Sequence, residues 1–167
     1  MIKVLVSACL LGERVRYHGG EATSGSPILA SWLAEHRIVP FCPEVAGGLG
    51  VPRPAAEIRG AGGPAVLDGA AHVVTAAGAD VGASFLHGAR LALDIALAEG
   101  VRLAVLKEGS PSCGTGFIYD GSFTGGRRAG QGVTAALLER HGLRAFSELE
   151  IGEAAQYLRE LEAASLV

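Results

Sequence analysis

KVLVSACLLG, residues 3–12, is the stretch that decides the fold class of this chain. Its first part, Lys3–Ser7, is a short apolar run with β-branched residues, which fits a buried strand. Similar runs at Arg37–Phe41, Val101–Leu106 and Leu143–Phe146 fit further strands. Because helical patterns separate these runs, the sequence predicts an α/β fold: a Rossmann-like parallel sheet of about four strands with flanking helices.

Helix signals lie between the predicted strands. Ser26-Pro27 puts an N-cap residue before a proline at the first helical position. Asp80 precedes the longest helical pattern, which runs to about Glu99. Val133–His141 is a further helix, and Ser147-Glu148-Leu149-Glu150 matches the capping box of a final one.

Two glycine-rich segments are expected to be loops, the first from Val45 to Gly63 and the second from Glu108 to Gly132. Directly after the first, Pro64–Val74 predicts a small β-hairpin insertion. In that hairpin, Ala65-Val66-Leu67 would pair with His72-Val73-Val74 across a turn at Asp68-Gly69.

Bulk properties narrow the class of protein. The chain has 167 residues without an obvious linker, which favours one domain over residues 1–167. Its net charge of −3 gives no overall attraction to nucleic acid or to an anionic membrane. The N-terminus does not fit a signal peptide and every apolar run is too short to cross a bilayer, so a cytoplasmic location is expected.

The three cysteines are the main functional signal. Cys9 follows the first predicted strand, Cys42 ends the second, and Cys113 lies in the loop after the third. In parallel sheets the functional crevice lies beyond the carboxyl ends of the strands. We therefore expect these three thiols to meet at one edge of the sheet.

Several kinds of site could use three converging thiols. Thiolates suit a soft metal or a cluster, whereas structural zinc normally takes four protein ligands, often in C-x-x-C pairs that this chain lacks. A four-iron cluster can use three cysteines and leave one iron open to a substrate. Ordinary buried cysteines remain the alternative, although placement at strand ends argues against it.

Longer motifs carry a resemblance to a known family. They are VSACLLG (6–12), RY (16–17), CPEVAGGLGVPR (42–53), AEI (56–58), LKEGSPSCG (106–114), IYDGSF (118–123) and GQGVTAALL (130–138). In these motifs and their order the chain resembles the thiouracil desulfurase (desulfidase) family. It departs from the expected pattern at His18 and Ala55.

The resemblance implies a 4Fe–4S cluster held by Cys9, Cys42 and Cys113, with one iron free of protein ligands. It also implies catalytic roles for Glu44, in the C-P-E motif, and for Ser110, in S-P-S-C. Both lie close to a cysteine in sequence, where a partly desolvated carboxylate can act as general acid or base.

The function expected on these grounds is hydrolytic desulfuration of a thiolated pyrimidine such as 2-thiouracil, giving the oxo-pyrimidine and sulfide. Ser112 and Arg53 are candidate substrate-binding residues. For Arg53 a structural role is favoured, in which it fixes its loop by pairing with Glu57. A small molecule is the expected partner, with neither membrane nor nucleic acid. The rival interpretation is a non-catalytic iron–sulfur or metal-binding sulfur carrier or redox module.

Overall fold

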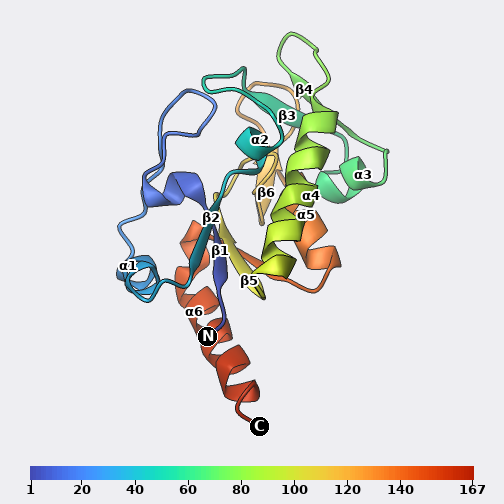
Figure 1. Cartoon of the computed structure of the whole chain (residues 1–167). Coiled ribbons are helices and arrows are strands. Elements are labelled where there is room, and N and C mark those ends of the chain that lie inside the picture. The colour runs from blue at the N-terminus through green and yellow to red at the C-terminus, as the bar shows by residue number, and fades with distance from the viewer.

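A parallel sheet of four strands forms the centre of the computed structural model, which describes residues 1–167 (Figure 1). The strand order is β2-β1-β5-β8, and all neighbouring pairs are parallel. The strands are β1 Val4–Ser7, β2 Ile38–Phe41, β5 Leu103–Leu106 and β8 Arg144–Ser147. The predicted fold class is confirmed, and each strand begins within one or two residues of its predicted start.

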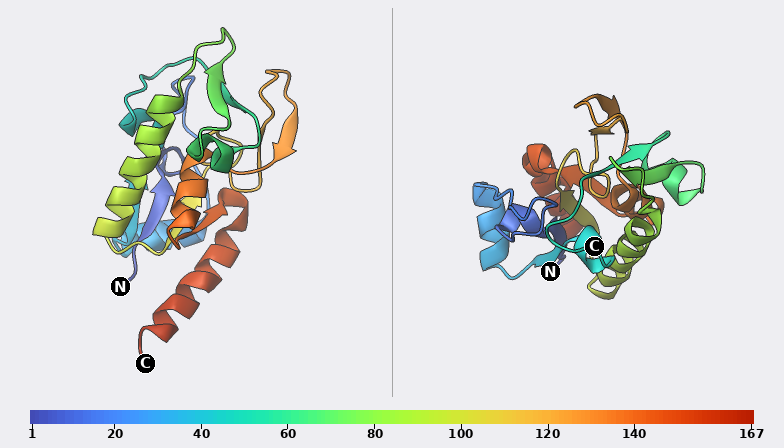
Figure 2. Two further views of the ribbon diagram at one scale, coloured as in Figure 1. Left: turned by 90° about the vertical axis from the view of Figure 1, so that its right-hand side faces the viewer. Right: turned by 90° about the horizontal axis from the view of Figure 1, so that it is seen from above.

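Helices cover both faces of this sheet (Figure 2). The helices of the chain are α1 Pro27–Ala34, α2 Pro43–Ala46, α3 Gly63–Leu67, α4 Gly82–Ala98, α5 Val133–Arg140 and α6 Ile151–Ala164, with short 3₁₀ turns η1 Ala8–Leu11 and η2 Glu148–Glu150. The buried side chains of α1 and α6 pack with Val4 and Val6 on one face. Those of α4 and α5 pack with Leu5 on the other, because successive strand residues point to opposite faces.

The predicted caps Ser26 and Ser147 are confirmed by their contacts, whereas the N-cap of α4 is Val81 and not the predicted Asp80. The Ser26 hydroxyl accepts a hydrogen bond from the Ile28 N–H at 3.2 Å. Ser147 and Glu150 form the reciprocal capping box before α6. Asp80 lies two residues before α4 and accepts from the Gly82 N–H at 2.8 Å.

The predicted hairpin at Pro64–Val74 is wrong in one strand. Residues Gly63–Leu67 form helix α3, and β4 (His72–Thr75) pairs antiparallel with β3 (Ala56–Arg59), which the sequence pattern had placed in a loop. Proline lacks the N–H that a strand ladder needs but is tolerated in the first turn of a helix, and a short apolar run is ambiguous between the two. An antiparallel hairpin insertion does exist, with a different first strand.

A second hairpin lies inside the long glycine-rich segment. Strand β6 (Phe117–Tyr119) pairs antiparallel with β7 (Arg127–Ala129), so the segment from Glu108 to Gly132 is not loop throughout. Both hairpins lie on the side of the molecule to which the parallel strands point (Figure 1). They therefore add walls to the edge of the sheet where the site was predicted.

Close packing of α2 on α4 fixes the start of α2. A Cβ atom at Gly88 of α4 would lie 1.9 Å from the carbonyl oxygen of Pro43, so only glycine allows this approach. The contact holds Pro43, and with it Glu44, against the longest helix.

None of the helices combines the length and the apolar composition that a membrane-spanning segment needs.

Candidate functional site

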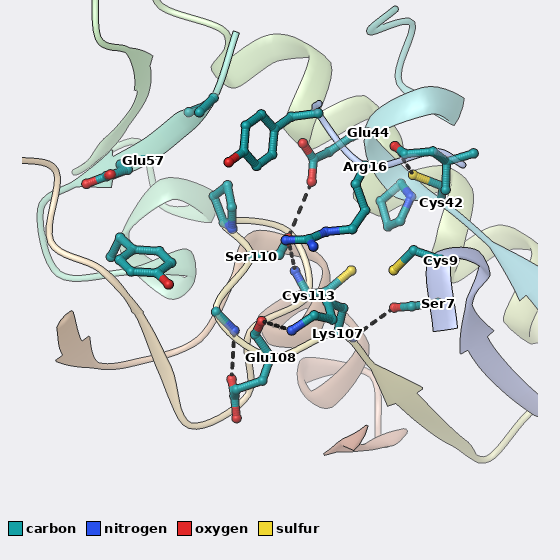
Figure 3. A pocket seen from close by; sticks show the side chains of 18 of the residues that line it. Ser7, Cys9, Arg16, Cys42, Glu44, Glu57, Lys107, Glu108, Ser110 and Cys113 are labelled. Atoms are coloured by element: carbon teal, nitrogen blue, oxygen red, sulfur yellow. Dashed lines mark hydrogen bonds between the residues drawn. The ribbon is translucent and has the colours of Figure 1, made fainter. Parts of the chain in front are cut away.

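A cavity of about 400 Å³ lies beyond the carboxyl ends of β1, β2 and β5 (Figure 3). Its wall includes all three cysteines: Cys9 from η1, Cys42 directly after β2, and Cys113 from the loop after β5. All three are free thiols, with Cys9 and Cys113 buried and Cys42 half-buried. The predicted convergence of the three thiols at one edge of the sheet is confirmed.

Burial keeps these thiols protonated in the metal-free protein. It raises the pKa of Cys9 to about 11, with a further rise from the nearby Cys42. Burial also raises the pKa of Cys42, and that of Cys113 well above the ordinary value, although a hydrogen bond with Ser7 opposes the latter. A metal or cluster bound here would displace these protons, since thiolates are the ligands.

The spacing of the thiols does not suit one metal ion. No group of three His, Cys, Asp or Glu side chains lies close enough to hold a single ion. A lone zinc binds thiolates at about 2.3 Å and would bring its ligand sulfurs within about 4 Å of one another. Three thiols that line one cavity are a donor set that fits a polynuclear cluster instead.

Glu44 lies on the same cavity wall and is held from three directions. Its Oε1 accepts from Arg53 Nε at 3.2 Å. Its Oε2 accepts from Ser112 Oγ at 3.1 Å and from Ser110 Oγ at 3.3 Å. The side chain is 16% exposed, so the carboxylate is fixed and largely shielded but open to the cavity.

The hydroxyl O–H of Ser110 can point in one direction only. Its Oγ accepts from the backbone N–H groups of Ser112 at 3.0 Å and Cys113 at 3.1 Å. Since these donors occupy the oxygen lone pairs, the O–H points to the Glu44 carboxylate. A hydroxyl that donates to a carboxylate is the arrangement of a nucleophile or proton relay with its base.

The remaining predicted residues take different places. Ser112 is buried and does not line the cavity; its hydroxyl contacts Glu44 from behind. Arg53 lines the cavity, but its side chain is only 6% exposed and also donates to Val15 O at 2.9 Å and Gly50 O at 3.1 Å. The expected Arg53–Glu57 pair is wrong, because Arg53 pairs with Glu44.

Glu57 has another role. Its Oε1 accepts from the N–H groups of Gly121 at 3.0 Å and Phe123 at 3.1 Å. These bonds hold the tip of the β6–β7 hairpin beside β3, with the Phe123 ring on the cavity wall. Phe123 has φ +59°, an uncommon conformation for a residue with a side chain.

Sequence analysis missed Glu108, which organises the loop that carries Ser110 and Cys113. Its buried carboxylate accepts from the N–H groups of Thr115 at 2.8 Å and Gly116 at 3.1 Å, and also from those of Gly109 and Phe117. Burial raises the pKa of Glu108, but the N–H donors together lower it further, so the net pKa lies below the ordinary value. The signal available in the sequence was the position of this glutamate at the start of a glycine-rich segment, whose backbone N–H groups can reach a carboxylate.

The start of α5 holds the other side of this loop. The N–H groups of Val133 and Thr134 donate to the carbonyls of Pro111 at 2.8 Å and Ser112 at 2.9 Å. A Cβ atom at Gly132 would lie 2.4 Å from the backbone of Ser112, so the contact requires glycine. The free N–H groups of the helix end are thereby satisfied, and the cysteine loop is fixed.

Four basic side chains line the cavity: Arg16, Arg53, Lys107 and Arg127. Lys107 Nζ donates to Glu148 Oε1 at 2.9 Å and to the Glu108 carbonyl at 3.2 Å. The Arg127 guanidinium lies 4.3 Å from the centre of the Phe117 ring. The sequence assigned no role in the site to Arg16 or Lys107.

Fold and site together define a class: a parallel α/β protein in which soft metal ligands and a carboxylate–hydroxyl pair share one cavity, as in metal-dependent hydrolytic enzymes. The model of the 2-thiouracil desulfurase family matches residues 4–150. The chain therefore belongs to the 2-thiouracil desulfurase family.

Two similar proteins support this assignment. The protein YbbK of Bacillus subtilis (strain 168) is 45% identical over 150 residues, which cover 90% of this chain and 98% of YbbK. The solved structure of the [4Fe-4S]-dependent thiouracil desulfidase TudS is 51% identical, with a TM-score of 0.87 and full coverage of both chains. This chain is thus similar to TudS over its whole length, hairpins included.

Proposed function

We propose that this chain, acting as one domain, hydrolyses the thiocarbonyl of a thiolated pyrimidine such as 2-thiouracil with the help of a 4Fe–4S cluster. The observation that carries the proposal is the Ser110–Glu44 pair on the wall of the cavity that gathers the three cysteines. The full-length similarity to a [4Fe-4S]-dependent thiouracil desulfidase supports it.

Cys9, Cys42 and Cys113 would hold the cluster, because no other set of soft donors lines the cavity. When bound through three thiolates, such a cluster supplies one iron without a protein ligand, which is a Lewis acid with affinity for sulfur. The protein's own groups then have to bind the ring, position a water molecule and move its protons.

Glu44 and Ser110 are the groups placed to move those protons. In the proposed reaction, water attacks the ring carbon and gives one proton to Glu44, directly or through Ser110. The carbon–oxygen bond forms and the carbon–sulfur bond breaks. The leaving sulfide takes up both protons of the water, one returned by Glu44 and one from the new hydroxyl as it becomes the carbonyl. Water and a thiocarbonyl thus give a carbonyl and hydrogen sulfide without net oxidation or reduction.

Ser112 and Arg53 would serve this reaction by positioning Glu44. The Ser112 hydroxyl and the Arg53 guanidinium contact different oxygens of the Glu44 carboxylate and prevent its rotation. Direct contact of Arg53 with substrate stays a prediction. The cavity volume falls in the usual range for small-molecule sites, roughly 300–1,000 Å³, which agrees with a small substrate.

The test uses protein that is reconstituted with iron and sulfide under anaerobic conditions and then supplied with 2-thiouracil. The wild type should release sulfide and form uracil. Glu44→Gln should keep its iron but lose about a hundredfold or more in turnover, since proton transfer contributes at least that much. Equal turnover in Glu44→Gln and wild type would remove Glu44 from the mechanism. An iron-loaded wild type without desulfuration would favour the carrier or redox module.

A further inference from the structure

Arg16 is the one basic side chain of the cavity wall that is left without a partner. Arg53 is paired with Glu44 and Lys107 with Glu148. Arg127 packs over the rings of Phe117 and Tyr119. Arg16 makes no ion pair, no side-chain hydrogen bond and no cation–π contact, although it is half-buried and its side chain points into the cavity (Figure 3).

The Arg16 guanidinium has no protein acceptor, and its nitrogen atoms are not buried, so they are free to bind a ligand in the cavity. Arginine carries five N–H donors and stays charged at any pH that the protein meets. Donors that are open to the cavity can exchange a water molecule for an acceptor on a ligand. The side chain is also close enough to the thiols to affect the pKa of Cys9. Arg16 is therefore beside the position where the reacting part of a substrate has to lie.

Backbone hydrogen bonds fix the position of the Arg16 main chain. The Arg16 N–H donates to Gly20 O at 3.1 Å, and Arg16 O accepts from the Gly19 N–H at 2.8 Å, which closes a tight turn. Arg53 holds the residues on either side: its N–H donates to Tyr17 O at 2.7 Å and its guanidinium to Val15 O at 2.9 Å.

Because the same Arg53 side chain also holds Glu44, one anchor sets the position of Arg16 relative to Glu44. Arg53 therefore holds both the loop that carries the free guanidinium and the carboxylate of the proposed base, Glu44. A group that Arg16 binds is placed at a defined distance from the proton-transfer pair.

We propose that Arg16 binds the ring oxygen of the substrate and so selects uracil-type rings, which carry an oxo group beside a ring nitrogen, over thiopyrimidines without one. This inference rests on the proposed function. With the sulfur directed to the cysteines, the remaining acceptor of 2-thiouracil is its oxo oxygen, because both ring nitrogens carry a hydrogen. The planar fork of a guanidinium can donate two N–H groups to the lone pairs of that oxygen, and the bonds strengthen as negative charge develops on it.

The experiment compares two ring types in three proteins: wild type, Arg16→Gln and the matched control Arg14→Gln. Arg14 is an exposed arginine two residues away that does not line the cavity. Iron and sulfide content are measured first, and rates are expressed per cluster. Sulfide release is followed with 2-thiouracil and with pyrimidine-2-thione, which lacks the oxo group.

For Arg16→Gln, kcat/KM for 2-thiouracil should fall roughly ten- to a hundredfold, the loss expected for a hydrogen bond to a charged group. For pyrimidine-2-thione the fall should be small, and Arg14→Gln should behave as wild type on both rings. Equal losses on the two rings would show that Arg16 only offsets the negative charge of the thiolates, which contradicts the proposal.

Binding of uracil to the cluster-loaded proteins, measured by calorimetry, gives a readout that does not depend on turnover. Uracil should bind at least tenfold more weakly to Arg16→Gln than to Arg14→Gln. Unchanged uracil affinity would overturn the assignment, even if 2-thiouracil is never desulfurated and the proposed function itself fails. If Arg16→Gln loses its cluster, the same measurements are made on Arg16→Lys. Full recovery of the preference for 2-thiouracil over pyrimidine-2-thione by the lysine point charge argues against recognition by the planar guanidinium.

Discussion

Two loops contribute residues to the cavity wall, and they are held in different ways. The thiol loop, residues 107–117, follows β5 and carries Ser110 and Cys113. Its backbone is tied by the Glu108 carboxylate from within and by the start of α5 from outside. The arginine loop, residues 12–25, follows η1 and carries Arg16. Most of its hydrogen bonds run within the loop or to residues 8–10, and Arg53 supplies the contact to the opposite wall.

The difference corresponds to what each loop has to do. A cluster ligand and a proton relay must keep their geometry within a fraction of an ångström, because both metal binding and proton transfer depend steeply on it. A substrate-binding side chain has to admit the substrate first and can rely on the ligand for its final contacts. The fixed loop therefore carries the proposed chemistry, and the lightly held loop the proposed recognition. The following predictions test that division, from the largest expected effect to the smallest.

Removal of a thiol should have the largest effect. Cys113→Ala takes one of the three soft ligands from the cavity, and we expect anaerobically reconstituted protein to lose both its iron and its brown colour. Iron and acid-labile sulfide analysis measures this, with Arg14→Gln as a control of equal preparation. Full iron content in Cys113→Ala would end the three-ligand assignment.

Removal of the relay hydroxyl should spare the cluster and lose the reaction. Ser110→Ala removes the donor to Glu44 and the acceptor of two N–H groups. Turnover of 2-thiouracil should fall about a hundredfold, with iron content close to that of the wild type. Normal turnover would mean that Glu44 works without Ser110.

Loss of the Glu108 carboxylate should loosen the thiol loop. In Glu108→Gln one acceptor oxygen becomes an amide that cannot accept, so backbone N–H groups are left unpaired. We expect a loss of about 1–3 kcal/mol in the free energy of unfolding, together with lower iron content. Urea titration of both proteins measures the first and iron analysis the second. Unchanged stability would show that water replaces the carboxylate at no cost.

The lowered pKa of Glu108 also predicts how the free energy of unfolding depends on pH. The folded-state pKa of Glu108 lies below its ordinary value, so the unfolded chain binds the proton at higher pH than the folded protein does. This contribution to stability is complete above the ordinary glutamate pKa of about 4.3 and is lost as pH falls through the lowered folded value. Wild-type stability should therefore drop more steeply in acid than that of Glu108→Gln.

Changes in the arginine loop away from Arg16 should matter least. His18→Ala, at an exposed residue that contacts only the N–H of Gly20 and the Tyr17 ring, should change the free energy of unfolding by less than about 0.5 kcal/mol. The same urea titration measures it. A loss as large as that of Glu108→Gln would show that the two loops are equally fixed.

The site itself was predictable from sequence because it depends on strand ends. Cys9 lies two residues after, and Cys42 directly after, an apolar run that was correctly predicted to be a strand, and parallel strands end at a common edge. The contact between Ser110 and Glu44 was not predictable in the same way. It joins residues that are 66 positions apart and depends on how α2 packs against α4.

The errors have a similar origin. Ala65-Val66-Leu67 was assigned to a strand because short apolar runs carry no period that separates strand from helix. Strand β3 was missed because its partner lies across a helix and not across a tight turn. Glu108 resembled an ordinary charged loop residue, since its role depends on N–H groups seven to nine positions later that gather only in the folded loop.

The central claim is that three cysteines hold a cluster with one iron open to the substrate sulfur. Mössbauer spectroscopy of protein reconstituted with ⁵⁷Fe tests it most directly, before and after anaerobic addition of 2-thiouracil. We expect about four irons per chain, one of them distinct from the other three, with only that one changed by the substrate. Four equivalent irons, or an unchanged spectrum while uracil is formed, would contradict it.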